Sequence, residues 1–325
     1  MANIGLIGCG MWGRNLARNL AQLQALAAVA DRNQKSAEEF ASQFDVVATP
    51  IDAILSDGNV SGIVVATSAR SHVDLAIQIL NSGKHVYVEK PLALNLADAQ
   101  EVAAAAKRNN RQVMVGHLIR YHAAFIELQE QVRAGAIGKL RHIQANRLAM
   151  GRIRNTESVL FDLCPHDLSL ILALTGLEPT TISCAGASHV TRGVVDTLAT
   201  VLGFTEGVSA IMQTCWISPY KEHRLTVSGT VGSIVFDDTK AWPEKLVLFQ
   251  DHIRPDDESF IIERASPVAL PVAESEPLKE EMRTFIDSCL TGKPIPSNID
   301  EALAVQRTLE TMRATLLDMS IIETL

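Results

Sequence analysis

The chain has 325 residues, 47% of them hydrophobic and 20% charged, and a formal net charge of −8 at pH 7. This length allows two domains of about 100–200 residues each, and the ordinary shares of glycine and proline argue against a disordered or fibrous protein. The net negative charge argues against general nucleic-acid binding, because that binding needs basic side chains that neutralise phosphates.

The first 118 residues alternate short apolar runs with longer amphipathic runs, a pattern typical of a parallel sheet wrapped in helices. The short runs predict strands at Asn3–Gly8, Ala27–Asp31, Val46–Ala48, Gly62–Ala66, His85–Glu89 and Gln112–Gly116. The amphipathic runs predict helices at Trp12–Gln24, Lys35–Phe44, Arg70–Ser82 and Ala97–Asn109. We therefore expect a doubly wound α/β domain over residues 1–118.

Beyond residue 118, apolar and polar residues alternate along several segments, as they do in an antiparallel sheet with one covered face. These segments predict strands at Arg141–Leu148, Thr181–Val190, Val194–Gly203, Val208–Trp216, Arg224–Phe236 and Leu246–Gln250. Helices are predicted from Pro165 onward, at Glu276–Leu290 and at Ile299–Leu317, and edge strands and loops at Pro255–Pro277. We expect a second α/β domain over residues 119–325 with an open, mainly antiparallel sheet, whose last helices pack back on the first domain.

The chain carries no signal for a membrane or a secretory route. No apolar run approaches the ~18–20 residues that cross a bilayer, and the first residues lack the basic region and cleavage site of a secretory signal. The five cysteines are widely spaced, without a C-x-x-C pair. We expect a cytoplasmic protein with reduced thiols, no metal site and no membrane contact.

A glycine-rich motif follows the first predicted strand and opens the first helix. The stretch Gly8-Cys9-Gly10-Met11-Trp12-Gly13 is a G-x-G-x-x-G, and Asp31 ends the second strand. In this context Gly8 permits a tight turn, Gly10 lets the backbone approach a pyrophosphate, and Gly13 allows close packing of helix on strand. Asp31 can accept hydrogen bonds from the ribose hydroxyls and would repel a 2′-phosphate, which favours NAD, although Arg32 beside it can contact such a phosphate.

A second motif, Gly83–Ala93 with Glu89-Lys90-Pro91 at its centre, follows the fifth strand. Together with Ala66-Thr67-Ser68, His72 and the Asp162–Asp167 segment, it resembles the glucose–fructose oxidoreductase / inositol dehydrogenase / MocA family over essentially the whole chain. The resemblance implies a Rossmann domain that binds NAD, an α/β domain with an open sheet, and pairing through that sheet into homodimers or homotetramers. It adds the following residues to the cofactor site: Met11, Trp12, Thr67, Ser68, His72, Glu89 and Lys90.

The Glu89-Lys90-Pro91 motif and the Asp162–Asp167 segment supply three candidate catalytic residues. Lys90 stands at the carboxyl end of the fifth strand, where open α/β sheets bind ligands, and would orient a hydroxyl and stabilise its anionic form. His166 can accept a proton near neutral pH. Asp162, four residues before His166, can orient the imidazole or cap the following helix.

The region from residue 120 to residue 154 carries seven basic residues against Glu127 and Glu130. Because Arg suits phosphate recognition, we expect part of this region to bind a diphosphate, with hydrogen bonds or stacking from neighbouring rings. Arg133 and Lys139 flank a predicted turn and Arg141 is left unassigned, so the predicted substrate site comprises His117, Arg120, Tyr121, His122, Arg147, Arg152 and Arg154.

Local features resemble one branch of the family, the NAD-dependent 3-dehydrogenases of UDP-N-acetylhexosamines and their uronic acids. These features are Met11–Leu16, Gly116–His122, Asn146–Leu148 and Gly151–Arg154. The resemblance implies oxidation of the 3-hydroxyl of UDP-N-acetylglucosamine to a ketone, which a partner aminotransferase would aminate during synthesis of lipid A or another surface glycan.

Three alternatives stay open at this point. The substrate can be the corresponding UDP-N-acetylhexosaminuronate, which needs a further cation for its carboxylate. It can be inositol or a free sugar, for which the basic region has no clear use. The family also includes a dinucleotide-binding regulator that senses sugars without turnover, and retention of Lys90 and His166 argues against that role.

Overall fold

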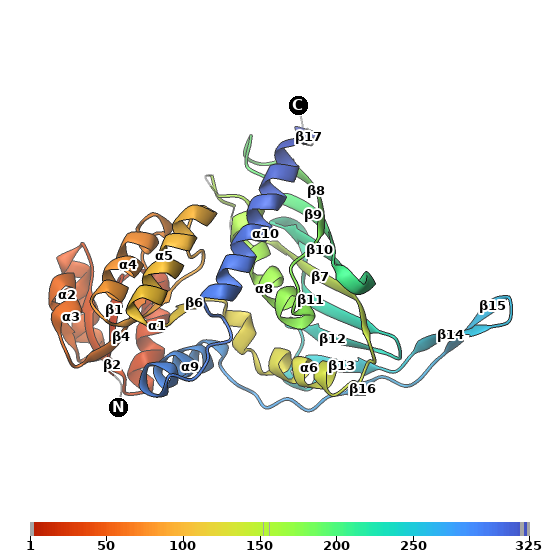
Figure 1. Cartoon of the computed structure of the whole chain (residues 1–325), viewed down its shortest axis with the longest axis horizontal. Coiled ribbons are helices and arrows are strands. Elements are labelled where there is room, and N and C mark those ends of the chain that lie inside the picture. The colour runs from red at the N-terminus through yellow and green to blue at the C-terminus, as the bar shows by residue number, and fades with distance from the viewer. Residues whose placement is uncertain (1–2, 152, 156, 319–321, 324–325) are drawn as a thin grey trace. The chain divides into compact units, whose positions relative to one another are not determined.

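The computed structural model describes residues 3–151, 153–155, 157–318 and 322–323. The chain forms two compact units (Figure 1). Unit 1 comprises Met1–Tyr121 and Ser275–Gln306, and unit 2 comprises His122–Glu274 and Arg307–Leu325.

Unit 1 is built on a six-stranded parallel sheet with the order β3-β2-β1-β4-β5-β6. The strand order reverses between β1 and β4, which is the switch point where open α/β sheets bind ligands at the carboxyl ends of their strands. The strands are β1 (Asn3–Ile7), β2 (Leu26–Ala30), β3 (Val47–Ala48), β4 (Val60–Val65), β5 (His85–Val88) and β6 (Val113–Val115).

Helices cover both faces of this sheet because successive strand residues point to opposite sides. Val64 and Tyr87 join one apolar cluster, with α1, α2 and α9, whereas their neighbours Val65 and Val88 join the other, with α4 and α5. The helices of unit 1 are α1 (Met11–Gln22), α2 (Gln34–Phe44), α3 (Ile51–Ser56), α4 (His72–Asn81), α5 (Leu96–Asn109), α9 (Pro277–Thr291) and the beginning of α10 (Ile299–Asp318), with short 3₁₀ turns η1 (Ala69–Ser71) and η2 (Leu118–Tyr121).

The unit boundaries differ from the expected division into residues 1–118 and 119–325. Residues 275–306 belong to unit 1, because α9 presents Leu278, Met282 and Phe285 to the apolar cluster that α1 and α2 share. The chain passes from unit 1 to unit 2 within α10, between Gln306 and Arg307.

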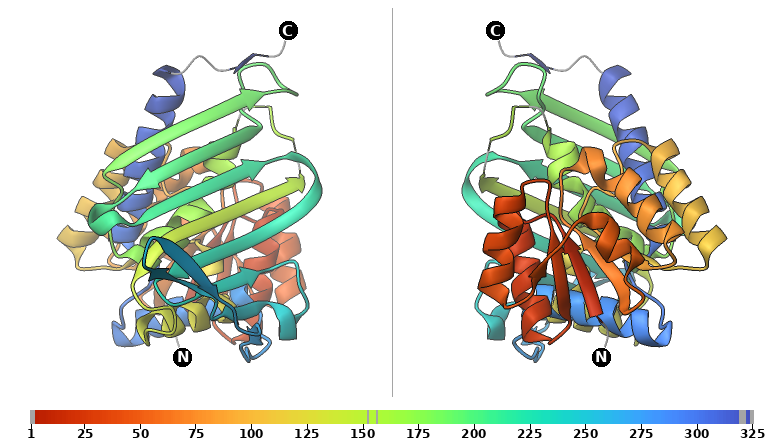
Figure 2. Two further views of the ribbon diagram at one scale, coloured as in Figure 1. Left: turned by 90° about the vertical axis from the view of Figure 1, so that its right-hand side faces the viewer. Right: turned by 90° about the vertical axis from the view of Figure 1, so that its left-hand side faces the viewer.

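Unit 2 contains a nine-stranded sheet with the order β16-β13-β12-β11-β7-β10-β9-β8-β17 (Figure 2). Among the described residues, β10 runs parallel to β7 and β17 runs parallel to β8, and the other pairings are antiparallel. The strands are β7 (Leu140–Met150), β8 (Thr181–Ser188), β9 (Thr197–Gly203), β10 (Ser209–Cys215), β11 (Ile217–Gly229), β12 (Ser233–Asp237), β13 (Leu246–Phe249), β16 (Val268–Ala269) and β17 (Ile322–Glu323).

One face of this sheet is covered and the other is open. In β9, Leu198 and Leu202 are buried while Ala199 and Val201 between them are exposed. Helix α8 contacts β7 and β10, and α6 contacts β12. The remaining elements of the covering layer and its loops are α6 (Ala123–Arg133), α7 (Val159–Asp162), α8 (Cys164–Thr175), η3 (Thr205–Gly207) and η4 (Trp242–Glu244).

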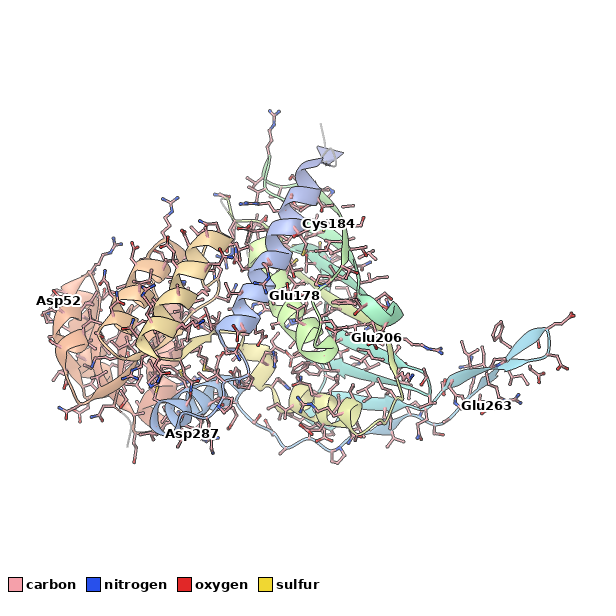
Figure 3. All side chains as sticks on the ribbon, in the orientation of Figure 1. Asp52, Glu178, Cys184, Glu206, Glu263 and Asp287 are labelled. Carbon is pink, nitrogen blue, oxygen red and sulfur yellow. The ribbon has the colours of Figure 1, made fainter. Side chains whose placement is uncertain are left out.

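The segment expected to hold edge strands contains a separate hairpin, β14 (His252–Asp256) paired with β15 (Ser259–Glu263). Figure 1 shows it extending from the sheet of unit 2, and Figure 3 labels Glu263 on it. Because alternate residues share a face, four apolar side chains lie together on one side of the ribbon, and all four are exposed: Ile253, Pro255, Phe260 and Ile262.

The chain also departs from the predicted elements in detail. Helices α3 and α6 were not predicted, and the predicted strand Arg224–Phe236 is two antiparallel strands, β11 and β12, joined by a turn. All five cysteines are free thiols.

Candidate active site

The glycine-rich turn between β1 and α1 is shaped by close backbone contacts. Gly8 has φ +109°, and a Cβ placed on it would lie 2.6 Å from the backbone of Ala66. A Cβ on Gly13 would lie 2.0 Å from the carbonyl oxygen of Gly8. A Cβ on Gly10 would meet nothing within 4 Å. Packing therefore requires glycine at the first and third positions, whereas Gly10 borders open space.

The N-terminus of α1 at this turn is not capped by a side chain, and its first turn has no acidic residue. Backbone N–H groups and the positive end of the helix dipole therefore remain available for an anion. Asp31, beside the turn, accepts hydrogen bonds from the backbone N–H of Cys9 (2.7 Å) and of Asn33 (2.8 Å). The site fits a dinucleotide, with Gly10 and the α1 N-terminus placed for the pyrophosphate and Asp31 for the ribose; Arg32 is exposed.

The loop after β4 carries three further predicted cofactor residues. Thr67 accepts a hydrogen bond from the Ser71 hydroxyl (2.8 Å), and Ser68 is exposed. His72 is buried, with its ring nitrogens 2.8 Å from the carbonyl oxygen of Pro91 and 3.1 Å from that of Thr67. Burial lowers the pKa of His72, and the two carbonyl contacts oppose that change. His72 joins the loops after β4 and β5, and its burial supports that role over direct contact with a cofactor.

The end of β5 carries Glu89, Lys90 and Pro91, with a cis peptide bond between the last two. Glu89 accepts hydrogen bonds from the Trp12 indole and from the Tyr87 hydroxyl. Lys90 is half-buried at the carboxyl end of the strand. Close by, His117 is buried, and burial together with the positive charges of Arg120 and Lys90 lowers its pKa to about 3, so its ring is neutral at neutral pH.

The predicted base, His166, lies in the first turn of α8 and is half-buried. Asp162, at the end of α7, accepts hydrogen bonds from Arg154 (2.9 Å) and from the Trp216 indole (3.2 Å). These contacts fix the carboxylate of Asp162 in unit 2. Its role as the acid that orients His166 stays a prediction.

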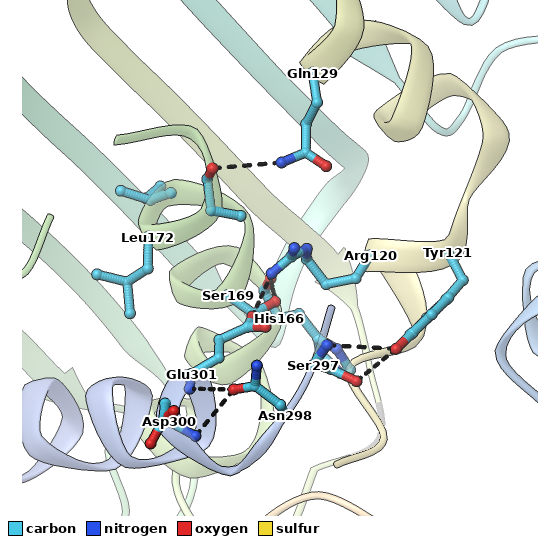
Figure 4. A network of polar contacts seen from close by, with 12 residues as sticks. Arg120, Tyr121, Gln129, His166, Ser169, Leu172, Ser297, Asn298, Asp300 and Glu301 are labelled. Atoms are coloured by element: carbon cyan, nitrogen blue, oxygen red, sulfur yellow. Dashed lines mark hydrogen bonds and ion pairs between the residues drawn. The ribbon is translucent and has the colours of Figure 1, made fainter. Parts of the chain in front are cut away.

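At the start of the basic region, Arg120 is held inside unit 1. Its guanidinium lies 2.5 Å from the carboxylate of Glu301, and both side chains are about nine-tenths buried (Figure 4). Burial raises the pKa of Glu301 to about 7, although Arg120 opposes this rise. Beside this pair, Tyr121 shares a hydrogen bond with Ser297 (2.7 Å), and Asn298 caps the first turn of α10.

Later in the basic region, arginines of unit 2 also contact carboxylates. Arg147 makes a two-pronged contact with buried Asp167 (2.6 and 3.1 Å). Arg154 bonds Glu157 as well as Asp162. Arg152 lies outside the described residues.

His122 also belongs to unit 2, where its ring stacks on Trp242 and lies 3.4 Å from Asp238. The expected local excess of positive charge is therefore offset by acids, several of them distant in sequence. Glu301 and Asp167 are the residues that sequence reasoning missed, and only the Asp162–Asp167 motif hinted at the second.

Two family models match the chain in succession. Residues 2–117 match an oxidoreductase family with an NAD-binding Rossmann fold, and residues 125–235 match the GFO/IDH/MocA C-terminal domain. The chain belongs to the Gfo/Idh/MocA family. The predicted fold class, a Rossmann domain followed by a mainly antiparallel sheet, is confirmed, and NAD is the cofactor that this family's Rossmann domain binds.

Relatives within the Gfo/Idh/MocA family act on different substrates. A UDP-N-acetylglucosamine 3-dehydrogenase from Acidithiobacillus ferrooxidans is 34% identical over 189 residues, a match that covers 58% of this chain and 58% of that protein. A myo-inositol 2-dehydrogenase from Thermotoga maritima is 28% identical over 310 residues, covering 90% of this chain and 89% of that one. The solved structure of the Acidithiobacillus enzyme superposes with a TM-score of 0.82 over 97% of both chains, at 25% identity.

Two further features of the described residues bear on the site. No group of three or more His, Cys, Asp or Glu side chains in this part of the chain is arranged to hold a metal ion. No helix within it is both long and apolar enough to span a membrane.

Proposed function

We propose that this family member oxidises the 3-hydroxyl of UDP-N-acetylglucosamine to a ketone with NAD. The observation that carries the proposal is the position of Lys90, half-buried at the carboxyl end of β5, on the same sheet edge as the glycine-rich turn. The choice of sugar rests on similarity to the Acidithiobacillus 3-dehydrogenase.

Lys90 and His166 perform different parts of this reaction. Bound NAD supplies the hydride acceptor. The ammonium of Lys90 orients the sugar hydroxyl and stabilises its anionic form, since a positive charge favours loss of the hydroxyl proton. His166 accepts that proton, since an imidazole can act as a general base near neutral pH.

Arg154 is our candidate for contact with the substrate diphosphate. Its side chain is 39% exposed, whereas Arg147 is 11% exposed and Arg120 is 9% exposed. An exposed guanidinium can exchange a carboxylate partner for a phosphate, whereas a buried pair is costly to break.

Oxidation of a neutral polyol such as inositol is a second candidate. The pairing of Arg120 and Arg147 with carboxylates leaves less positive charge for a diphosphate than the sequence suggested. A myo-inositol 2-dehydrogenase also matches over most of the chain.

One assay separates the two candidates. The purified protein is incubated with NAD and either UDP-N-acetylglucosamine or myo-inositol, with and without 2-oxoglutarate as a possible reoxidant of NADH. Nicotinamide absorbance follows the cofactor, and mass spectrometry looks for a sugar lighter by two hydrogens. A 3-keto nucleotide sugar supports our proposal, and turnover of inositol alone contradicts it.

The proposal includes a homo-oligomer. The open face of the sheet exposes Val201, and the β14–β15 hairpin exposes Phe260 and Ile262 on its apolar side. An exposed apolar face such as that of the hairpin often marks an interface. We expect light scattering coupled to gel filtration to give a dimer or tetramer, and Val201→Glu to shift it toward the monomer.

A further inference from the structure

Helix α9 places a carboxyl group in the interior of unit 1. Glu281 has no solvent exposure, and its neighbours Leu278, Met282 and Phe285 belong to the apolar cluster around β5. Its Oε2 lies 3.2 Å from the Tyr87 hydroxyl, while its Oε1 has no hydrogen-bond partner among the described residues. A buried, ionised carboxylate with so few donors is costly, and the proposed chemistry gives Glu281 no role.

The Tyr87 hydroxyl connects this carboxyl to a second one. It lies 2.8 Å from Glu89 Oε1 as well as 3.2 Å from Glu281 Oε2. A hydroxyl has one proton and can donate it to one acceptor only. The shorter contact assigns that proton to Glu89, so the contact with Glu281 is a hydrogen bond only if Glu281 carries a proton and donates it to the tyrosine oxygen.

The surroundings of the two carboxyls support this assignment. Glu89 accepts from the Trp12 indole N–H, from Tyr87 and from the backbone N–H of Lys90 (3.3 Å), as an ionised carboxylate does. Burial and the charge of Glu89 raise the pKa of Glu281 well above its ordinary value. Burial also raises the pKa of Glu89, but the bonds from Trp12 and Tyr87 and the charge of Lys90 act in the opposite direction.

The titratable groups that face Glu281 come from two neighbouring elements. Glu89 and Tyr87 belong to β5 and its end, and Tyr121 belongs to η2. Burial raises the pKa of Tyr121 well above its ordinary value, so this tyrosine is neutral as well. Among these described groups, no positive charge offsets an ionised Glu281.

The space around the bridge that Tyr87 forms between Glu89 and Glu281 is closely filled. A Cβ on Gly116, just beyond β6, would lie 2.6 Å from the Tyr87 hydroxyl and 3.0 Å from Glu89 Oε2. Any side chain at position 116 would therefore crowd both groups, so the bridge requires glycine there. The bridge ends at Trp12, whose indole donates to Glu89 and which lies in the first turn of α1, directly after the glycine-rich turn.

We propose that Glu281 is a neutral carboxylic acid and a positioning residue, which fixes Glu89 through Tyr87 and thereby fixes Trp12 and the dinucleotide turn. This inference concerns the dinucleotide site of the proposed function and does not depend on which sugar is oxidised. Helix α9, encoded far from the glycine-rich motif, would thus set the affinity for NAD.

The state of Glu281 is tested by infrared difference spectroscopy on the full-length protein. We expect a carbonyl stretching band of a protonated carboxyl that persists at pH 8 in the wild type and disappears in Glu281→Gln. Glu280→Gln, which alters a partly exposed carboxylate on the same helix, is the matched control and should leave the band in place. Absence of a band that Glu281→Gln removes would overturn the proposal.

The positioning role is tested with ¹⁵N-tryptophan-labelled protein and NAD titrations. The chain has three tryptophans, so the Trp12 indole signal can be assigned by its loss in Trp12→Phe. Glu281→Met cannot donate to Tyr87, and we expect it to shift the Trp12 signal and to weaken NAD binding about tenfold, the equivalent of one buried hydrogen bond. Glu281→Gln retains a donor and should keep both near wild type.

Two further results make the outcome decisive. Tyr87→Phe removes the bridge, so Glu281→Gln and Glu281→Met should then have the same NAD affinity. If Glu281→Met proves unstable, the infrared band and the Glu281→Gln titration still decide. An unchanged Trp12 signal in a folded Glu281→Met protein would refute the positioning role. Because none of these measurements needs a sugar, failure of the UDP-sugar assay leaves them valid.

Discussion

At the glycine-rich edge of unit 1, positive potential comes from backbone N–H groups that no side chain caps, whereas along residues 120–154 it comes from arginines that carboxylates already hold. A helix N-terminus keeps its attraction for anions until a ligand arrives. An arginine loses most of its attraction once a buried acid pairs with it. A cofactor site formed by backbone groups can therefore be predicted from the local sequence. A site formed by charged side chains can be predicted only when the fold shows which charges are already paired.

The largest effect on activity should come from Lys90, which lies on the same sheet edge as the glycine-rich turn. We expect Lys90→Met to lower kcat by about 10²–10⁴-fold, the usual contribution of a group that assists proton transfer, while NAD affinity stays within a few-fold. Steady-state kinetics and NAD titration measure the two effects. Lys107→Met, which alters an exposed lysine of the same unit, is the control, and near-full turnover by Lys90→Met would remove the proposed chemistry.

Arg147 tests the other side of the comparison. Because Asp167 is buried, with a side-chain exposure of 4%, Arg147→Met leaves an unpaired buried charge and should lower the free energy of unfolding by about 3–5 kcal/mol. Arg133→Met breaks only an exposed pair with Glu130 and should cost about 1 kcal/mol or less. Urea unfolding gives both values, and equal losses would show that the Arg147 pair is not structural.

Glu301 should make stability depend on pH. Its pKa of about 7 in the folded chain exceeds its ordinary value of 4.5, so its stabilisation is complete below pH 4.5 and is lost as pH rises through 7. We expect wild type to lose up to about 3 kcal/mol relative to Glu301→Gln across this window. Urea unfolding at several pH values measures the difference, and parallel curves for the two proteins would contradict the prediction.

The glycines give the smallest and most selective effect. Gly10→Ala adds a methyl group where no atom lies within 4 Å, so stability should hold while NAD affinity falls about tenfold as the methyl blocks the pyrophosphate. Gly13→Ala places its methyl group against the carbonyl oxygen of Gly8 and should reduce stability and affinity together. Thermal unfolding and NAD titration distinguish the two patterns. A stability loss in Gly10→Ala as large as that in Gly13→Ala would contradict the assignment.

Most of unit 1 was predictable because its signals are local. Each strand is a short apolar run. The three glycines, the helix that follows them and Asp31 all lie between residues 8 and 31. Helix α3 was not predicted because its six residues are too few to show the helical periodicity of apolar positions. In α6 only part of one face is apolar, and the buried Gln129 interrupts it.

The candidate site was only partly predictable because its other half depends on residues far apart in sequence. Arg120 and its partner Glu301 are separated by more than half of the chain, and no residue near Arg120 in the sequence indicates this pairing. The same holds for Glu281. Its partner Tyr87 lies in a buried strand, where the sequence pattern predicts only apolar packing for it. Local charge counts therefore overestimated the positive charge left for a substrate.

The return of residues 275–306 to unit 1 has a consequence for biosynthesis. The ribosome releases Tyr121 about 180 residues before Gln306, the last residue of that unit. At roughly 5–20 residues per second this delay lasts about 10–40 s. During that time the part of this sheet face that Met282 and Phe285 later cover still lacks helix α9, although α1 and α2 have already been made. Unit 1, the first to be started, is thus completed only after residues 122–274 of unit 2 have been made, and we expect chaperones to bind its uncovered sheet face during translation.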